Sequence, residues 1–354
     1  MYTILVDKLE NNDWKSRGFD LNSTIRKILP ALILVLALPL LAACQGSGQS
    51  ESKLTLVAYS TPREAYEEIV PAFSKTDAGK GVAFDTSFGS SGEQSRAVEG
   101  GLPADVIALS LEPDITRLVK AGIVDANWNQ GEYKGMVHHS VLAFAVRSGN
   151  PKNIRTSDDL LKTVVEVVTP NPFTSGGARW NVMAAYGARL ETGESPEQAT
   201  AYLGELFKHV KVQDKSARES LQTFIGGKSD VMLAYENEVV TARQKGEKLD
   251  YVIPEQTILI ENPVAVAKDS KSPEQARAFV EYLRSPEAQR IFAEKGYRPV
   301  NAQVLSEVEF EQPGTLFEIS KLGGWSAVQA RFFDPKSGVT ATINRERGQA
   351  VESR

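Results

Sequence analysis

Four short stretches combine serine or threonine with small residues at points where a strand is expected to give way to a helix. They are Ser60-Thr61-Pro62, Ser90-Ser91-Gly92, Thr174-Ser175-Gly176-Gly177 and Ser216-Ala217-Arg218. Hydroxyl residues cap helix N-termini, and glycine leaves the backbone N–H groups uncovered. A helix start offers unpaired N–H donors and roughly half a positive charge, which together attract anions. Capping alone explains any one junction, whereas several junctions around one cleft would form an anion site.

Three of these junctions also have the spacing of a capping box, in which a hydroxyl residue is followed three positions later by a glutamate or glutamine. The pairs are Thr61 with Glu64, Ser91 with Gln94, and Ser216 with Glu219. Thr61 precedes Pro62, which suits the first position of a helix. The sequence therefore predicts that helices begin at these places.

Catalytic constellations are poorly matched. The segment Gly226-Gly227-Lys228-Ser229 looks like the end of a phosphate-binding loop, but Gln222 stands where the first glycine is required. The three histidines do not have metal-ligand spacing, and none lies in a junction motif where it could activate Ser175 as a nucleophile. We expect no enzyme, no metal and no cofactor, with a phosphoester hydrolase or transferase as the alternative.

The elements that must position the junctions alternate between strand and helix. Strands are predicted at residues 53–60, 82–89 and 104–110, and helices at 61–73, from 90 onward and at 112–121. This order predicts an α/β fold with a mainly parallel sheet. Residues 140–151 and 257–270 are long extended segments that interrupt the order, and a second strand–helix unit lies between them.

Two α/β lobes joined by two extended crossings follow from this pattern, with a ligand cleft at the carboxyl ends of the strands. The predicted boundaries are residues 53–142 for the first part of lobe 1 and 143–262 for lobe 2. Residues 263–354 are predicted to complete lobe 1 and to supply C-terminal helices.

The N-terminal region is typical of a secretory signal. Arg26-Lys27 precedes an apolar run that ends in Leu41-Ala42-Ala43-Cys44, and Cys44 is the single cysteine of the chain. This end resembles a bacterial lipobox. Residues 1–43 are therefore predicted to be a lipoprotein signal peptide, Cys44 the lipidated residue, and residues 44–52 a flexible tether. An ordinary signal peptide that happens to contain a cysteine is the alternative.

The charge balance excludes some partners. The 354 residues carry a net charge of −5, and removal of residues 1–43, with five basic and four acidic residues, leaves −6. A nucleic-acid partner has no support from a basic excess. A single cysteine also excludes an intrachain disulfide.

Six segments occur in an order that resembles the prokaryotic sulfate-binding proteins, the extracytoplasmic receptors of sulfate/thiosulfate ABC importers. They are AYSTPREAYEE, FGSSGEQSRAV, PNPFTSGGARWN, SARES, LAYENE and SPEAQRIFAEKGYRPV, and the resemblance extends from about residue 54 to residue 333. It implies a type II periplasmic-binding fold that closes around a dehydrated tetrahedral dianion. Backbone N–H groups and a few hydroxyl or indole donors would hold that ion.

The resemblance also implies a donor set. It consists of the N–H of Ser91, the hydroxyl of Ser175, the N–H groups of Gly176, Gly177 and Ala217, and Tyr235 at a position that commonly carries tryptophan. Tyr235 is a departure, because a phenol can accept a hydrogen bond as well as donate one. Ser60 is another, since some family members have an acidic residue there.

A second group is expected to support the donors from behind: Ser60, Thr61, Asp114, Arg179 and Arg218. The two arginines could instead pair directly with the anion. Support through carboxylates of the cleft is the preferred interpretation, with Asp105 and Asp114 as possible partners of the arginines.

The resulting prediction is a periplasmic, membrane-anchored and monomeric receptor that binds sulfate, or thiosulfate, and delivers it to an ABC permease driven by a cytoplasmic ATPase. A receptor for phosphate or molybdate, and an anion sensor for a membrane kinase, are the alternatives from binding classes.

Overall fold

The computed structural model describes residues 52–351, so Cys44, the signal peptide and all but the last residue of the tether lie outside the described residues. The strands are β1 (Ser52–Tyr59), β2 (Val82–Gly89), β3 (Val106–Ala108), β4 (Met136–Arg147), β5 (Val167–Val168), β6 (Val210–Val212), β7 (Val231–Tyr235), β8 (Leu249–Val252), β9 (Gln256–Val266), β10 (Arg298–Pro299) and β11 (Thr315–Phe317).

The helices are α2 (Arg63–Phe73), α3 (Ser91–Glu99), α4 (Glu112–Lys120), α5 (Gly176–Glu191), α6 (Pro196–His209), α7 (Ala217–Ile225), α8 (Glu236–Gln244), α9 (Pro273–Tyr282), α10 (Pro286–Glu294), α11 (Ala302–Glu307), α12 (Gly324–Phe332) and α13 (Val339–Glu346), with short 3₁₀ helices at Ser157–Leu161 and Ile319–Leu322. No helix in this part of the chain has both the length and the apolar composition needed to cross a membrane.

The sheet contains two groups of parallel strands, which confirms the predicted α/β class. It is mixed, however, and not mainly parallel as predicted, because five of the ten strand pairings among the described residues are antiparallel. The first strand group is β2, β1 and β3, and the second strand group is β7, β5 and β6. Between them lie β9 and β4, so that the order along the sheet is β2-β1-β3-β9-β4-β7-β5-β6. β9 is antiparallel to β3, and β4 is antiparallel to both β9 and β7.

The two long strands β4 and β9 correspond to the predicted extended crossings. Residues 136–141 of β4 pair with β9, and residues 142–146 pair with β7 in the second strand group. β9 likewise pairs with β4 and then, at residues 264–266, with β3 in the first strand group. Ten of the twelve residues of β4 are buried, which explains why this strand is apolar almost throughout. The exact lobe boundaries at residues 142 and 262 stay a prediction.

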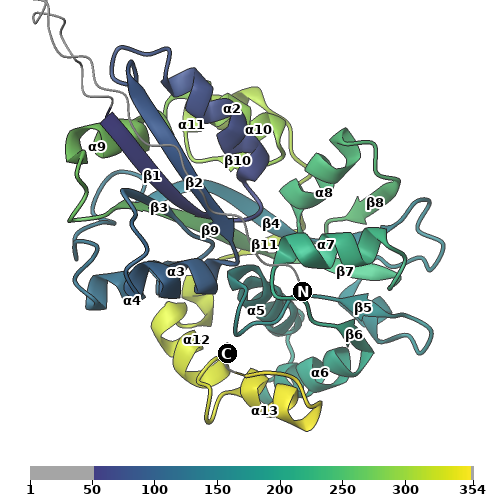
Figure 1. The fold of residues 1–354 in the computed structure, drawn as a ribbon. Coiled ribbons are helices and arrows are strands. Elements are labelled where there is room, and N and C mark those ends of the chain that lie inside the picture. The colour runs from purple at the N-terminus through teal and green to yellow at the C-terminus, as the bar shows by residue number, and fades with distance from the viewer. Residues whose placement is uncertain (1–51, 352–354) are drawn as a thin grey trace, which may run out of the picture. The chain divides into compact units, whose positions relative to one another are not determined.

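Helices cover both faces of the first strand group (Figure 1). One face packs against α2, α9 and α10, where the rings of Phe73, Phe279 and Phe292 are fully buried. The other face packs against α3 and α4. Each strand of this group is followed directly by a helix, so the helix starts gather at the carboxyl ends of the strands.

The C-terminal helices pack on elements from different parts of the chain. Trp325 of α12 meets Trp180 of α5 edge to face, with ring centroids 4.7 Å apart. α12 also contacts α4, and α13 contacts α6 of the region around the second strand group (Figure 1). The chain after residue 323 therefore packs against α5 and helps to hold this helix in place.

Two of the three predicted capping boxes are wrong. α2 begins at Arg63, and its N-cap is Pro62, whose side chain has no group that could cap the helix. The Glu64 carboxylate turns instead to the cationic side chains of Arg218 and Lys245. An ion pair with two cations outweighs a single hydrogen bond to a neutral N–H.

At α3 the residue before the helix is Ser90, and it makes no side-chain cap. The hydroxyl of Ser91 instead donates to Asp114, 2.6 Å away, and the amide of Gln94 donates to Ser87. At α7 the prediction is half right: the Ser216 hydroxyl accepts from the N–H of Glu219 at 3.2 Å, but the Glu219 carboxylate accepts from the N–H of Lys215.

Candidate functional site

The carboxyl ends of strands from both groups surround one small cavity of about 10 Å³, which is room for about one water-sized sphere. Thirteen of the described residues line it: Tyr59, Ser60, Thr61, Gly89, Ser90, Ser91, Ser110, Ser175, Gly176, Gly177, Ser216, Ala217 and Tyr235. Every one is Tyr, Ser, Thr, Gly or Ala, so the lining offers hydroxyl and backbone groups without a charged side chain.

Three helices begin at this cavity. Ser91 is the first residue of α3, Gly176 and Gly177 open α5, and Ala217 is the first residue of α7. N–H groups in the first turn of a helix have no intrahelical acceptor. Within residues 52–351, no hydrogen bond uses the N–H group of any of these four residues. The cavity is therefore bordered by at least four free donors, reinforced by the positive ends of three helix dipoles.

The two glycines of α5 serve different purposes. A Cβ atom on Gly176 would lie 2.2 Å from Cδ2 of Leu111 and 2.7 Å from Oγ of Ser110, so only glycine allows α5 to approach the loop after β3. A Cβ atom on Gly177 would make only ordinary contacts, the nearest at 3.5 Å to Oγ of Ser175. Gly177 thus leaves its N–H uncovered without being required by packing.

Ser175 is the N-cap of α5. Its Oγ accepts from the N–H of Ala178 at 3.4 Å, and its own N–H donates to the carbonyl of Asn171 at 2.9 Å. A hydroxyl that accepts from the backbone still has its proton to donate. The predicted donor role of this hydroxyl is compatible with its capping role.

The hydroxyl of Ser91 is fully occupied. It donates to Oδ2 of Asp114 at 2.6 Å and accepts from the N–H of Ser110 at 3.0 Å. Only the backbone N–H of Ser91 remains for a ligand. Asp114, predicted to support the donors from behind, contacts Ser91 and does not line the cavity.

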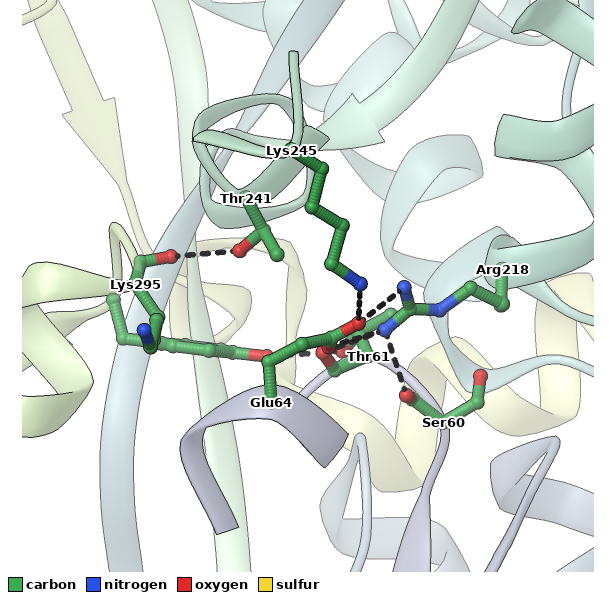
Figure 2. Close-up of polar contacts among 8 residues, drawn as sticks. Ser60, Thr61, Glu64, Arg218, Thr241, Lys245 and Lys295 are labelled. Carbon is green, nitrogen blue, oxygen red and sulfur yellow. Dashed lines mark hydrogen bonds and ion pairs between the residues drawn. The ribbon is translucent and has the colours of Figure 1, made fainter. Parts of the chain in front are cut away.

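Arg218 takes part in an ion cluster that joins the two strand groups. Its guanidinium pairs with both carboxylate oxygens of Glu64 on α2, at 2.7 and 2.5 Å, and donates to the carbonyls of Ser60 and Thr61 (Figure 2). Lys245, which follows α8, contacts the same carboxylate. Burial favours the neutral form of Glu64, but the hydrogen bonds from the two cations outweigh it and lower the pKa of Glu64 to about 2.

Ser60 and Thr61 lie closer to the cavity than predicted. Both line it directly, and their carbonyl groups are the ones that accept from Arg218. Arg218 contacts these carbonyl groups, does not line the cavity, and has its charge matched by Glu64. Its supporting role stays a prediction.

Arg179 also points away from the cavity. Its Nε donates to the carbonyl of Pro172 at 2.7 Å, Nη1 donates to Gln329 at 3.0 Å, and the guanidinium lies over the ring of Phe333. Burial lowers its pKa, and the charge of Asp114 acts in the opposite direction.

The expectation that Arg179 pairs with a carboxylate is wrong for the described residues, where it makes no ion pair. Asp114 is occupied by Ser91. Asp105 accepts from the N–H of Thr55 and the hydroxyl of Ser270, both away from the arginines.

Tyr235 ends β7 with its ring fully buried, and its hydroxyl lies 2.8 Å from the hydroxyl of Ser110. Burial raises the pKa of Tyr235 well above its usual value, and the nearby Tyr59 adds to this effect. The phenol is therefore neutral and keeps its proton. Ser110 was not predicted as a site residue, although it is the last residue of the strand predicted at 104–110, and the end of a strand is the signal that identified the other junctions.

All six predicted ligand residues line this one cavity: Ser91, Ser175, Gly176, Gly177, Ala217 and Tyr235. Their role as ligands stays a prediction. Ser90 and Ser216, which were expected at the junctions but not as ligands, also line the cavity, and the lining residues that sequence reasoning missed are Tyr59, Gly89 and Ser110.

Comparison with known proteins assigns the chain to a protein family. Residues 54–298 match the family model described as bacterial extracellular solute-binding protein. The chain belongs to this family. It is also similar to a sulfate-binding protein of Synechococcus elongatus, with 44% identity over 313 residues, which cover 83% of this chain and 89% of the relative.

Two further relatives of this solute-binding protein extend the comparison. A thiosulfate-binding protein of Pseudomonas aeruginosa is 35% identical and covers 82% of this chain and 92% of its own. The solved structure of the sulfate-binding protein SubI from Mycobacterium tuberculosis is 42% identical, with a TM-score of 0.78, and covers 80% of this chain and all of that one. The fold is accordingly the two-lobe type II fold of periplasmic binding proteins, as predicted.

Proposed function

We propose that this solute-binding protein takes up sulfate, or the related thiosulfate, in the cavity between its lobes and delivers it to an ABC importer. One observation carries the proposal: three helix N-termini converge on a small cavity that has hydroxyl and backbone donors but no charged side chain among its described lining residues. The names of the relatives point to the same class of ligand.

The proposed donors are the N–H groups of Ser91, Gly176, Gly177 and Ala217 and the hydroxyls of Ser175 and Tyr235. A buried dianion is costly unless its oxygen atoms are satisfied by aimed donors. Hydrogen bonds from such donors to an ion are about twice as strong as those between neutral groups. Sulfate carries no proton at neutral pH, so a lining rich in donors suits it better than hydrogen phosphate, whose O–H needs an acceptor.

The negative net charge is compatible with anion binding. The donors act at about 3 Å, whereas exposed carboxylates farther away than about 8–10 Å are largely screened by salt. Arg218 and Glu64, the nearest ion pair, compensate each other. We propose that these two residues, with Ser60, Thr61, Asp114 and Arg179, keep the donors in position.

The wider context of this function is also proposed. Residues 1–43 act as a lipoprotein signal peptide, and Cys44 carries the lipid that anchors the protein at the outer side of the cytoplasmic membrane. The protein acts as a monomer whose two lobes close on the ion. Lobe 1 consists of residues 53–142 and 263–354, and lobe 2 consists of residues 143–262. The permease subunits then receive the ion, and a cytoplasmic ATPase drives transport.

Calorimetry of the purified chain from residue 45 onward tests the proposal, with sulfate, thiosulfate, phosphate and molybdate titrated separately. We expect one sulfate ion per chain, a comparable or weaker affinity for thiosulfate, and much weaker binding of phosphate and molybdate. Preference for phosphate or molybdate would assign the protein to a different oxyanion. Turnover of a sulfate or phosphate ester would show that the protein is an enzyme and not only a binding protein.

A further inference from the structure

A pair of hydroxyl groups spans the cavity from one strand group to the other. Ser110 lies in the loop between β3 and α4, and Tyr235 is the last residue of β7. Their hydroxyl oxygens are 2.8 Å apart, both side chains are 1% exposed, and both residues line the cavity. Either oxygen can be the donor in this bond.

The backbone of Ser110 is held by three hydrogen bonds. Its N–H donates to the hydroxyl of Ser91 at 3.0 Å, and its carbonyl accepts from the indole N–H of Trp180 at 2.8 Å and the amide of Asn262 at 2.9 Å. The backbone of Ser110 is therefore fixed beside the cavity. Within residues 52–351, the hydrogen bond to Tyr235 is the only one that its hydroxyl makes.

The pair adjoins the first turn of α5, where two proposed donors lie. A Cβ atom placed on Gly176 would come within 2.7 Å of Oγ of Ser110, and one on Gly177 within 3.6 Å of Cε1 of Tyr235. Both residues of the pair thus contact the glycine turn from which the backbone N–H groups point at the cavity.

The number of hydroxyl protons in the pair decides how many remain for a ligand. Two hydroxyls have two protons, and the bond between them uses one. Whichever oxygen donates within the pair, the other hydroxyl keeps a proton for which residues 52–351 show no acceptor. The amide of Asn262 also contacts the phenol, but it lowers the pKa of Tyr235 and therefore donates to the phenol oxygen, which leaves the phenol's proton unused. We infer that Ser110 is a further anion-contacting residue and that Ser110 and Tyr235 act together as one donor unit. This inference rests on the proposed function of the cavity.

The two hydroxyls are then partly interchangeable. If Tyr235 loses its hydroxyl, the proton of Ser110 is released from the internal bond and is free for the anion. If Ser110 loses its hydroxyl, the same holds for the phenol of Tyr235. Only the loss of both removes the donor, so the effects of the two substitutions on affinity should be strongly non-additive.

A double-mutant cycle measured by sulfate calorimetry tests this. We expect Ser110→Ala and Tyr235→Phe each to weaken sulfate binding by no more than about threefold. The double variant should lose roughly 10- to 150-fold, the range expected for one hydrogen bond to a charged group. The loss in the double variant should clearly exceed the product of the two single losses.

Tyr202→Phe is a matched control, because its hydroxyl is also buried but donates to the carbonyl of Ser157 outside the cavity. It should leave sulfate affinity unchanged, and thermal melting of all variants reports on folding. If the double variant does not fold, Tyr235→Phe alone still decides the question. A loss of about 100-fold in that variant would make Tyr235 the sole donor and overturn the inference.

Two other results have separate meanings. Wild-type affinity in the double variant would show that neither hydroxyl contacts the anion, which overturns the inference but leaves the proposed function intact. Failure of the wild-type protein to bind sulfate would refute the proposed function itself, and the donor unit with it.

Discussion

Replacing Gly177 by proline should remove one donor from the proposed site while leaving the helix in place. Gly177 is the second residue of α5, and its N–H makes no hydrogen bond within the described residues. Proline has no N–H, and its ring is tolerated in the first turn of a helix. Losing one charge-assisted bond to a buried ion costs about 2–4 kcal/mol, so sulfate affinity should fall roughly 30- to 1,000-fold.

Gly177→Ala is the control that separates the lost donor from the added bulk. Alanine keeps the N–H, and its Cβ would meet nothing closer than 3.5 Å. We expect it to bind sulfate within about threefold of the wild type. Calorimetry gives the affinities, and circular dichroism with thermal melting shows whether both variants fold. Equal affinity in folded Gly177→Pro and Gly177→Ala proteins would mean that this N–H does not contact the ion.

Three further predictions concern salt, acidity and anchoring. Sulfate affinity should change less than about threefold between roughly 20 and 500 mM inert salt, because buried dipoles are screened far less than surface charge; a steep decline in calorimetry would indicate an exposed cationic patch. The pKa of Glu64 is lowered from 4.5 to about 2, so its carboxylate stabilises the fold above pH 4.5 and this contribution is lost as the pH falls towards 2. Glu64→Gln should therefore lower the melting temperature more at pH 7 than at pH 3, whereas the same change at the exposed Glu307 should have little effect at either pH; an equal loss at both pH values for Glu64 would contradict the ion-pair account. Cys44→Ser should move the protein from the membrane fraction to the soluble fraction without changing sulfate affinity, and continued membrane association would rule out the lipid anchor.

Much of the fold could be predicted because each signal is local. Period-two and apolar runs identified β1, β2 and β3, and the long apolar segments identified β4 and β9 as crossings. Strand–helix alternation then placed the junctions at one edge of the sheet. The cavity forms at that edge, so its lining includes all six predicted ligand residues.

The rest depended on contacts between distant parts of the chain. Glu64 and Lys245 are 181 residues apart, and no pattern in either segment indicates that they meet. Thr61 and Glu64 have capping-box spacing, but the energy of this charged contact decides the orientation of Glu64. Ser110 went unrecognised because a single serine after a strand carries no information about a phenol on β7.

The arrangement of the arginines explains how a receptor can be selective for an anion and still release it. At about 4 Å and an effective dielectric constant of about 20, one guanidinium would attract a dianion by roughly 8 kcal/mol before desolvation, or close to a millionfold in affinity. Such an attraction would act on any dianion and oppose release. Arg179 faces Pro172 and Gln329, and Arg218 is neutralised by Glu64. In the site that we propose, recognition is thereby left to hydrogen bonds at about 3 Å, which depend on the positions of the ligand's oxygens and protons. Each such bond is also weak enough to break when the lobes open.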